Sequence, residues 1–458
     1  MTPLRDHPRA RFFSLLKQTF DPTATAGRYA FGAAWSSVGA ISAQGFGLLA
    51  SVITARLLGR ESFGELIIIQ STVGMFGVFA GAGMGLTATK FVAELRTRNP
   101  IAAGRVIGVS TLAAIITGAI LTISLAFASP YLAQWAFKAA SLSGLLAVSS
   151  ALVGLNTVNG VQLGALAGLE AFRLIARLNA FRAAVSFVIV VVATSIWSLP
   201  GAVSAYILAA LVTCVVTHAT LRRELSRLGI RLLYRPTIDE WRMARDFSLP
   251  AFISGLLPTP AGWAANTILV ASPSGYSELA LFNVAVQWRT AILFFPSTFG
   301  NAILPILSSL RGRSARASQG RLMLLAMGVN VFFAAAVGGV VWLVSFWVLG
   351  WYGSGFRSAS AALNISIWAA ILTAPLMALG YYVVSENRMW LSSVLNGLQA
   401  CSLVGIFLLK TTKSAYTLSC AHLISICLHF IALGGASYLL WKGSGRRAGA
   451  GNLELGAD

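Results

Sequence analysis

The sequence predicts an all-α integral membrane fold of about twelve transmembrane helices, in two six-helix bundles related by a pseudo-twofold axis along the membrane normal. Three observations predict it. First, 57% of the 458 residues are apolar and only 10% are charged, whereas soluble domains carry roughly a quarter charged residues. Second, apolar runs of bilayer-spanning length recur along the chain. Third, Lys and Arg gather in alternate connections between these runs.

Twelve apolar runs have the length of roughly 20 residues that crosses about 30 Å of hydrocarbon. We expect helices, because lipid does not tolerate open sheet edges and the runs are about twice as long as a barrel strand. The runs are 33–55, 66–88, 106–128, 145–169, 178–197 and 202–221, followed by 249–270, 281–304, 324–349, 361–384, 390–409 and 415–440.

The connection between the sixth and seventh runs is the longest and is rich in arginine. Leucines interleave with these arginines, so the segment either lies as an interfacial helix against anionic headgroups or is a solvated linker. The halves also share a short segment, Ser62–Leu66 at the second run and Gly275–Leu279 at the eighth. The sequence therefore predicts an N-terminal segment 1–29, a first bundle 30–221, a connection 222–247, a second bundle 248–441 and a tail 442–458.

Lys and Arg are divided unevenly between alternate connections. The set that includes the N-terminal segment and the tail holds most of the 34 Lys and Arg residues. The other set holds only Arg56, Arg60, Lys138, Arg357, Lys410 and Lys413. Because cytoplasmic loops carry the excess of Lys and Arg, both termini are expected in the cytoplasm. The N-terminal segment lacks the apolar core and small-residue cleavage site of a signal peptide, so we expect it to be retained.

The formal net charge of +20 raises the alternative of nucleic-acid binding. We reject it, because the basic residues form short clusters between apolar runs, which is the pattern that orients membrane helices. The four cysteines lie inside apolar runs without ligand-like or disulfide-like spacing. The sequence also lacks a metal-ligand cluster and a glycine-rich nucleotide loop, so we expect no metal and no cofactor. Catalytic carboxylates do not cluster outside the runs, and we expect no enzymatic activity.

Three motifs carry a resemblance to a known family. Ala55–Glu65 ends the first run with an arginine, two leucines and a glycine, and continues through a loop with an aromatic residue and a glycine. Phe282–Thr290 lies in the eighth run, and Gly353–Arg357 precedes the tenth, which has a polar exit at Ser385–Asn387. Over about residues 29–441 the chain resembles the Wzx-type polysaccharide flippases, in the superfamily of multidrug exporters and peptidoglycan lipid flippases.

The resemblance implies a V-shaped pair of six-helix bundles around a central cavity, working by alternating access. It implies flipping of a polyprenyl-pyrophosphate-linked oligosaccharide across the bacterial cytoplasmic membrane, for surface polysaccharide biosynthesis. The expected partners are this lipid-linked anionic oligosaccharide, membrane lipids and the polysaccharide polymerase machinery. With the cell interior negative, outward movement of an anion is favoured by about 2.3 kcal/mol per charge per 100 mV.

The acidic residues separate this function from its alternatives. None of the 14 Asp and Glu residues lies near the middle of an apolar run. A multidrug or metabolite antiporter of the same superfamily is the second interpretation, but export of a cation usually requires a buried carboxylate. A membrane scaffold without transport activity is the third, and it predicts no cavity lined by charge.

Arg289 is the charge placed deepest in a run, at about 13 Å from the outer end of the eighth. At this depth it should face the bundle interior or a wet cavity, where a guanidinium can bind two phosphate oxygens. In the family a basic residue at the matching place is associated with substrate binding. The alternative is a bond to backbone carbonyls exposed near a kink at Pro296.

Other candidates for substrate binding lie near the ends or within other runs. Lys90, Arg173 and Arg182 could form a cytoplasmic entry funnel for an anionic headgroup, or act only as orientation signals. Arg56 lies at the opposite mouth, within the family motif. Asn156 and Asn159 on the fourth run either bind sugar hydroxyls or bond across a close helix contact.

Two further features concern coupling and motion. His422 and His429 share one face of the twelfth run with two serines, and either relay protons or form a polar packing seam. In the seventh run Pro258 and Pro260 remove backbone hydrogen bonds, so we expect a hinge or a static kink there. Pro250 and Pro296 are lesser hinge candidates.

Overall fold

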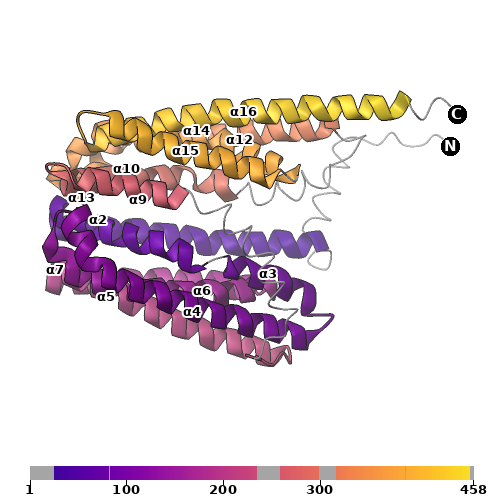
Figure 1. The fold of residues 1–458 in the computed structure, drawn as a ribbon, viewed down its shortest axis with the longest axis horizontal. Coiled ribbons are helices and arrows are strands. Elements are labelled where there is room, and N and C mark those ends of the chain that lie inside the picture. Colours follow the sequence, from indigo (N-terminus) through magenta and orange to yellow (C-terminus); the bar gives the residue numbers. More distant parts are fainter. Residues whose placement is uncertain (1–24, 82, 235–257, 299–315, 387, 454–458) are drawn as a thin grey trace.

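The computed structural model describes residues 25–81, 83–234, 258–298, 316–386 and 388–453. Within these ranges the chain is helical apart from short turns, and it contains no strand. Figure 1 shows the long helices running side by side in two layers. The predicted all-α membrane fold is confirmed.

The two layers follow the order of the chain. The N-terminal layer contains α2 (Thr25–Gly81), α3 (Met84–Leu95), α4 (Pro100–Tyr131), α5 (Ser143–Ser149), α6 (Ala151–Gly168) and α7 (Phe172–Arg227). The C-terminal layer contains α9 (Pro258–Val270), α10 (Gly275–Ile292), α12 (Arg316–Leu343), α13 (Ser345–Tyr352), α14 (Ser360–Ser385), α15 (Met389–Leu409) and α16 (Ala415–Leu453). This arrangement confirms the two-bundle prediction.

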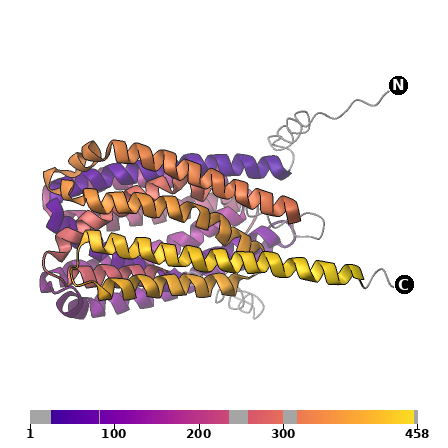
Figure 2. The same cartoon turned by 90° about the horizontal axis from the view of Figure 1, so that it is seen from above.

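The two longest helices of the N-terminal bundle are each divided by a sharp bend. α2 bends at Gly59, with φ 73° and ψ 178°, a conformation that glycine adopts without a Cβ clash. α7 bends at Trp197 and Ser198, where Ser198 has φ 53°. Each helix therefore folds back as two arms. We call the end with these bends the hairpin end, and the end at which α2 begins and α16 ends the tail end (Figures 1 and 2).

Eight stretches among the described residues are long and apolar enough to cross a membrane. They establish a protein that crosses the membrane several times. Two of them, Gly39–Gly81 and Phe172–Arg227, contain the bends, and each joins two of the predicted runs. The count of twelve stays a prediction, since the runs 249–270 and 281–304 extend outside the described residues.

α2 joins the two bundles, since it packs on α9, α10 and α13 as well as on α7. At the hairpin end, Gly64 lies so close to Tyr276 that a Cβ would overlap the tyrosine carbonyl oxygen. Phe63 meets Phe356 edge to face at 6.2 Å. The segments 62–66 and 275–279, which the sequence marks as similar, therefore lie against each other where the bundles meet.

The basic connection after the sixth run is described only as far as residue 234. Its first part continues α7 to Arg227. The chain then leaves the helix and runs along α4, where Gly104 contacts the carbonyl of Arg231 and Gly108 contacts that of Leu233. The first part of the connection is thus packed on the N-terminal bundle.

The described part of the seventh run begins at Pro258, the first residue of α9. Pro258 and Pro260 lie at the start of the described part of this helix. Pro250 lies outside the described residues. Pro296 lies in a helical segment that follows a break at Leu293. The proposed hinge stays a prediction.

Candidate functional site

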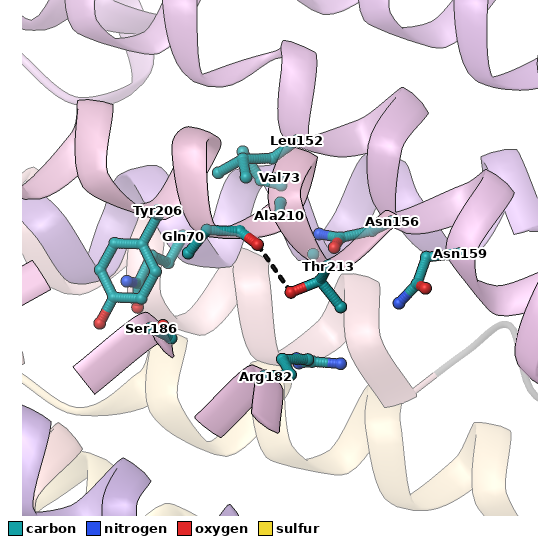
Figure 3. Close-up of a pocket in the computed structure, with 12 residues that line it drawn as sticks. Gln70, Val73, Leu152, Asn156, Asn159, Arg182, Ser186, Tyr206, Ala210 and Thr213 are labelled. Carbon is teal, nitrogen blue, oxygen red and sulfur yellow. Dashed lines mark hydrogen bonds between the residues drawn. The ribbon is translucent and has the colours of Figure 1, made fainter. Parts of the chain in front are cut away.

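A polar pocket of about 280 Å³ lies inside the N-terminal bundle. Both arms of α7, the second arm of α2, and α6 line it (Figure 3). Its lining contains three of the predicted site residues, Arg182, Asn156 and Asn159. The other lining residues are Gln70, Val73, Gly74, Leu152, Ser186, Tyr206, Ala209, Ala210 and Thr213.

The helices place these side chains by simple spacing rules. Asn156 and Asn159 are three residues apart on α6 and therefore share a face. The bend of α7 returns its second arm beside the first, so that Tyr206 and Thr213 line the same pocket as Arg182 (Figure 3). Thr213 is held by its own helix, because its hydroxyl donates to the carbonyl of Ala209 at 2.7 Å.

The pocket contains one charged side chain, the cation Arg182, and one buried hydrogen-bond acceptor without a partner among the described residues, Oδ1 of Asn159. None of its lining residues is acidic, and no carboxylate among the described residues forms an ion pair with Arg182. Asn159 is 6% exposed, and its Oδ1 has no hydrogen-bond partner in the described part of the chain. Since a buried acceptor without a partner is costly, this atom favours a bound water or a ligand donor.

A second pocket of about 270 Å³ adjoins the first and lies between the two bundles. Gln70 and Tyr206 line both pockets. Further lining residues come from both arms of α2 and from α10, namely Gln44, Gly47, Leu48, Ser51, Phe63, Leu66, Ile67, Asn283 and Gln287. The two pockets thus extend from the N-terminal bundle to the wall of the C-terminal bundle.

The C-terminal wall of this second pocket is a fixed hydrogen-bond chain. The Nε2 of Gln287 donates to Oδ1 of Asn283 at 2.6 Å. The hydroxyl of Tyr352 donates to Oε1 of Gln287 at 3.3 Å, and Tyr352 is fully buried. These bonds fix the orientation of both carboxamides.

A third, apolar crevice of about 820 Å³ lies along a neighbouring face of the first arm of α2. It is lined by Gly45, Leu48, Leu49, Val52, Ile53, Arg56, Leu57, Trp288 and Trp351, of which Arg56 alone is charged. Leu49, Leu57 and Trp351 are exposed, so the crevice opens toward the surrounding lipid. Leu48 lines both the crevice and the second pocket.

Arg289 lies apart from these pockets, inside the C-terminal bundle. Its Nη1 is 3.3 Å from Nδ1 of His422 on α16. Because a guanidinium can only donate, Nδ1 is the acceptor and the imidazole proton lies on Nε2. Phe282, two turns before Arg289, packs its ring against the same imidazole at 5.5 Å. α10 therefore presents Asn283 and Gln287 to the second pocket but Phe282 and Arg289 to α16.

The remaining predicted residues are not brought into the pockets described above. Lys90 and Arg173 are exposed toward the tail end of the N-terminal bundle, and the ammonium of Lys90 lies 5.0 Å from the ring of Phe91. His429 is 8% exposed on α16. The serine between the two histidines, Ser425, donates to the carbonyl of Gln399 on α15 at 3.4 Å.

Sequence reasoning did not single out several lining residues, including Gln44, Gln70, Ser186, Tyr206 and Thr213. A single Gln, Ser or Thr within an apolar run is a weak signal, since such residues also bond to their own helix. Only the folding back of α2 and α7 brings these five side chains to the two adjoining pockets.

The chain matches a known protein family and two curated relatives. The family model described as Polysaccharide biosynthesis protein matches residues 30–311. The chain belongs to this family. It also resembles the EPS I polysaccharide export inner membrane protein EpsE of Ralstonia nicotianae, with 29% identity over 161 residues, and that of Ralstonia solanacearum, with 28% identity over 161 residues. Each alignment covers 34% of this chain and 36% of the relative, so the chain matches about a third of these proteins' length.

Solved structures of MOP superfamily transporters share the fold of this member of the polysaccharide biosynthesis protein family. A multidrug resistance MATE family transporter matches in its inward-facing conformation, with a TM-score of 0.72, 17% identity and coverage of 87% of this chain and 96% of that one. Its outward-facing conformation matches with a TM-score of 0.69 and 17% identity, covering 91% and 96%. A Pyrococcus furiosus MOP transporter, described as having a binding pocket of reverse polarity, gives 0.68 and 16% identity, covering 91% and 96%.

Proposed function

We propose that this protein flips a polyprenyl-pyrophosphate-linked oligosaccharide from the cytoplasmic to the outer leaflet of the bacterial cytoplasmic membrane. The observation that carries the proposal is that a polar pocket and an apolar crevice lie along two faces of one helix arm, the first arm of α2. The polar second pocket, which adjoins the pocket of Arg182, lies along one face of the first arm of α2, and the apolar crevice lies along a neighbouring face. An amphiphile with a charged, hydroxyl-rich head and a long apolar chain matches this division.

Each part of the proposed substrate has a matching surface. The planar guanidinium of Arg182 suits a diphosphate, because it can donate to two oxygens at once. Asn156 and the unpartnered carbonyl of Asn159 suit sugar hydroxyls, which both donate and accept. The leucines and tryptophans of the crevice suit an isoprenoid chain.

The contacts between bundles support alternating access. Gly64 with Tyr276, and Phe63 with Phe356, close the bundles at the hairpin end. Lys and Arg are concentrated in the connections of the tail end, which we assign to the cytoplasm. Transport then requires these contacts to open while the tail end closes. Both termini lie in the cytoplasm, and the polymerase machinery is the proposed recipient on the outer side.

A multidrug or metabolite antiporter remains the alternative, and the pocket chemistry disfavours a cation as its cargo. A cation would need a carboxylate, and none of the residues that line the three pockets is acidic. For an anion, the membrane potential supplies about 2.3 kcal/mol per charge per 100 mV in the outward direction.

The test is to delete the gene and measure, by mass spectrometry, the amount and the leaflet of lipid-linked oligosaccharide. We expect accumulation on the cytoplasmic side, reversed by the wild-type gene and not by Arg182→Ala. Arg177→Ala is the matched control, because Arg177 is exposed on the same arm of α7 and does not line the pocket. Normal amount and sidedness in the deletion strain would exclude the flippase function.

A further inference from the structure

The second pocket differs from the first in being polar without being charged. Its polar lining residues are carboxamides and hydroxyls: Gln44, Ser51, Gln70, Tyr206, Asn283 and Gln287. Lys, Arg, Asp and Glu are absent from the lining. A charged ligand group placed here would lose its hydration without gaining an opposite charge, which is unfavourable in a membrane-buried site.

The carboxamides of this pocket are oriented before any ligand binds. Gln287 gives one N–H to Asn283 and accepts the hydroxyl of Tyr352. Its second N–H and both N–H groups of Asn283 have no hydrogen-bond partner among the described residues. A wall of fixed donors binds hydroxyl and ring oxygens without the entropy cost of ordering these side chains.

The two pockets are adjacent, because Gln70 and Tyr206 contribute to both. A headgroup that extends past these two side chains would contact both pockets. Arg182 lies in the first pocket only, and Asn283 and Gln287 lie in the second only. The two pockets thus differ in charge, and the uncharged one extends to the C-terminal bundle.

From this arrangement we infer a second subsite that recognises an uncharged sugar, formed by Asn283 and Gln287 opposite Gln70 and Tyr206. The inference rests on the proposed function and specifies its headgroup. The diphosphate lies at Arg182, and the neutral sugar beyond it contacts α10. This sugar touches both bundles, so recognition of the glycan is coupled to the position of the C-terminal bundle.

The test compares ligands bound to the purified full-length protein in nanodiscs. The probes are undecaprenyl diphosphate and the same lipid carrying an uncharged glucose disaccharide. For Asn283→Leu with Gln287→Leu, we expect at least tenfold weaker binding of the sugar-bearing probe, equivalent to about 1.4 kcal/mol. Binding of the bare lipid should stay within twofold. Arg182→Ala should weaken both probes by the same factor.

Two further variants keep the result interpretable if the leucine variant folds poorly. Tyr352→Phe removes the hydroxyl that orients Gln287 and should weaken only the sugar-bearing probe. Thr290→Ala is the control on α10, because its hydroxyl bonds to the carbonyl of Val286 and it does not line the pocket. Equal weakening of both probes by the α10 variants would overturn the second subsite. Failure of the wild type to bind either probe would instead overturn the proposed function.

Discussion

Gly64 on α2 and Tyr276 on α10 are in backbone contact where the two bundles meet. They belong to the two short segments that the sequence marks as similar, 62–66 and 275–279. Corresponding segments of a repeat meet when they lie near the axis that relates its halves. The contact is possible because position 64 has no side chain, since a Cβ there would overlap the carbonyl oxygen of Tyr276.

Gly64→Ala should therefore separate the bundles at the hairpin end. The added methyl cannot be accommodated by a side-chain rotation, because it meets backbone atoms. We expect a longer distance between spin labels at Ser62 and Ser274, with slower transport. Gly262→Ala is the control, because a Cβ there meets nothing within 4 Å. An unchanged label distance in Gly64→Ala would show that this contact does not hold the hairpin end closed.

The second prediction concerns the contribution of the Arg289–His422 contact to the stability of the protein. Sequence reasoning proposed Arg289 as a substrate ligand and His422 as a coupling residue, and the structure places the two side chains against each other. His422→Leu leaves the guanidinium without its acceptor and should destabilise the protein by about 1–3 kcal/mol. His422→Gln retains an acceptor and should cost much less. Thermal unfolding in detergent compares them, and equal losses would mean that the hydrogen bond contributes nothing.

The sequence could predict features that depend on neighbouring residues, but not those that depend on how distant segments meet. Apolar runs and the distribution of Lys and Arg are local, so the helical class and the two halves followed from them. Asn156, Asn159 and Arg182 were identified because polar groups stand out within or beside apolar runs, and they share one pocket. Their convergence was not predictable, because it depends on the bend of α7 at Ser198.

For Arg289, the depth in the membrane could be predicted from the sequence, but its neighbours could not. Its depth in the run predicts that it faces the bundle interior or a wet cavity, since a charge there cannot easily reach water. Which face of α10 it occupies was not readable from one sequence. Gln287 and Arg289 are two residues apart and thus point to different sides of the helix. The first lines the second pocket, and the second contacts α16.

A third prediction concerns the chain that follows α7. The carbonyls of Arg231 and Leu233 lie against Gly104 and Gly108, one turn apart on α4. Gly104→Leu or Gly108→Leu should displace this segment and lower the melting temperature by several degrees, because the side chain would overlap backbone. Gly144→Ala, where a Cβ has no neighbour within 4 Å, should melt like the wild type. Faster proteolysis after Arg231 would accompany the loss, and unchanged resistance to proteolysis would contradict the prediction.

The last prediction concerns the binding of the isoprenoid chain in the apolar crevice. Gly45 lines it, and a Cβ at this position would have no neighbour within 4 Å. A large side chain therefore fits there without strain and fills the space expected for the isoprenoid chain. Gly45→Phe should leave the melting temperature unchanged and reduce binding of undecaprenyl diphosphate at least tenfold. Gly328→Phe on α12, exposed and remote from the crevice, should change neither. Because the variant removes lipid contacts and leaves Arg182 in place, inorganic pyrophosphate should still compete with the same affinity as in the wild type. Undiminished lipid binding by Gly45→Phe would mean that the isoprenoid chain lies elsewhere on the protein.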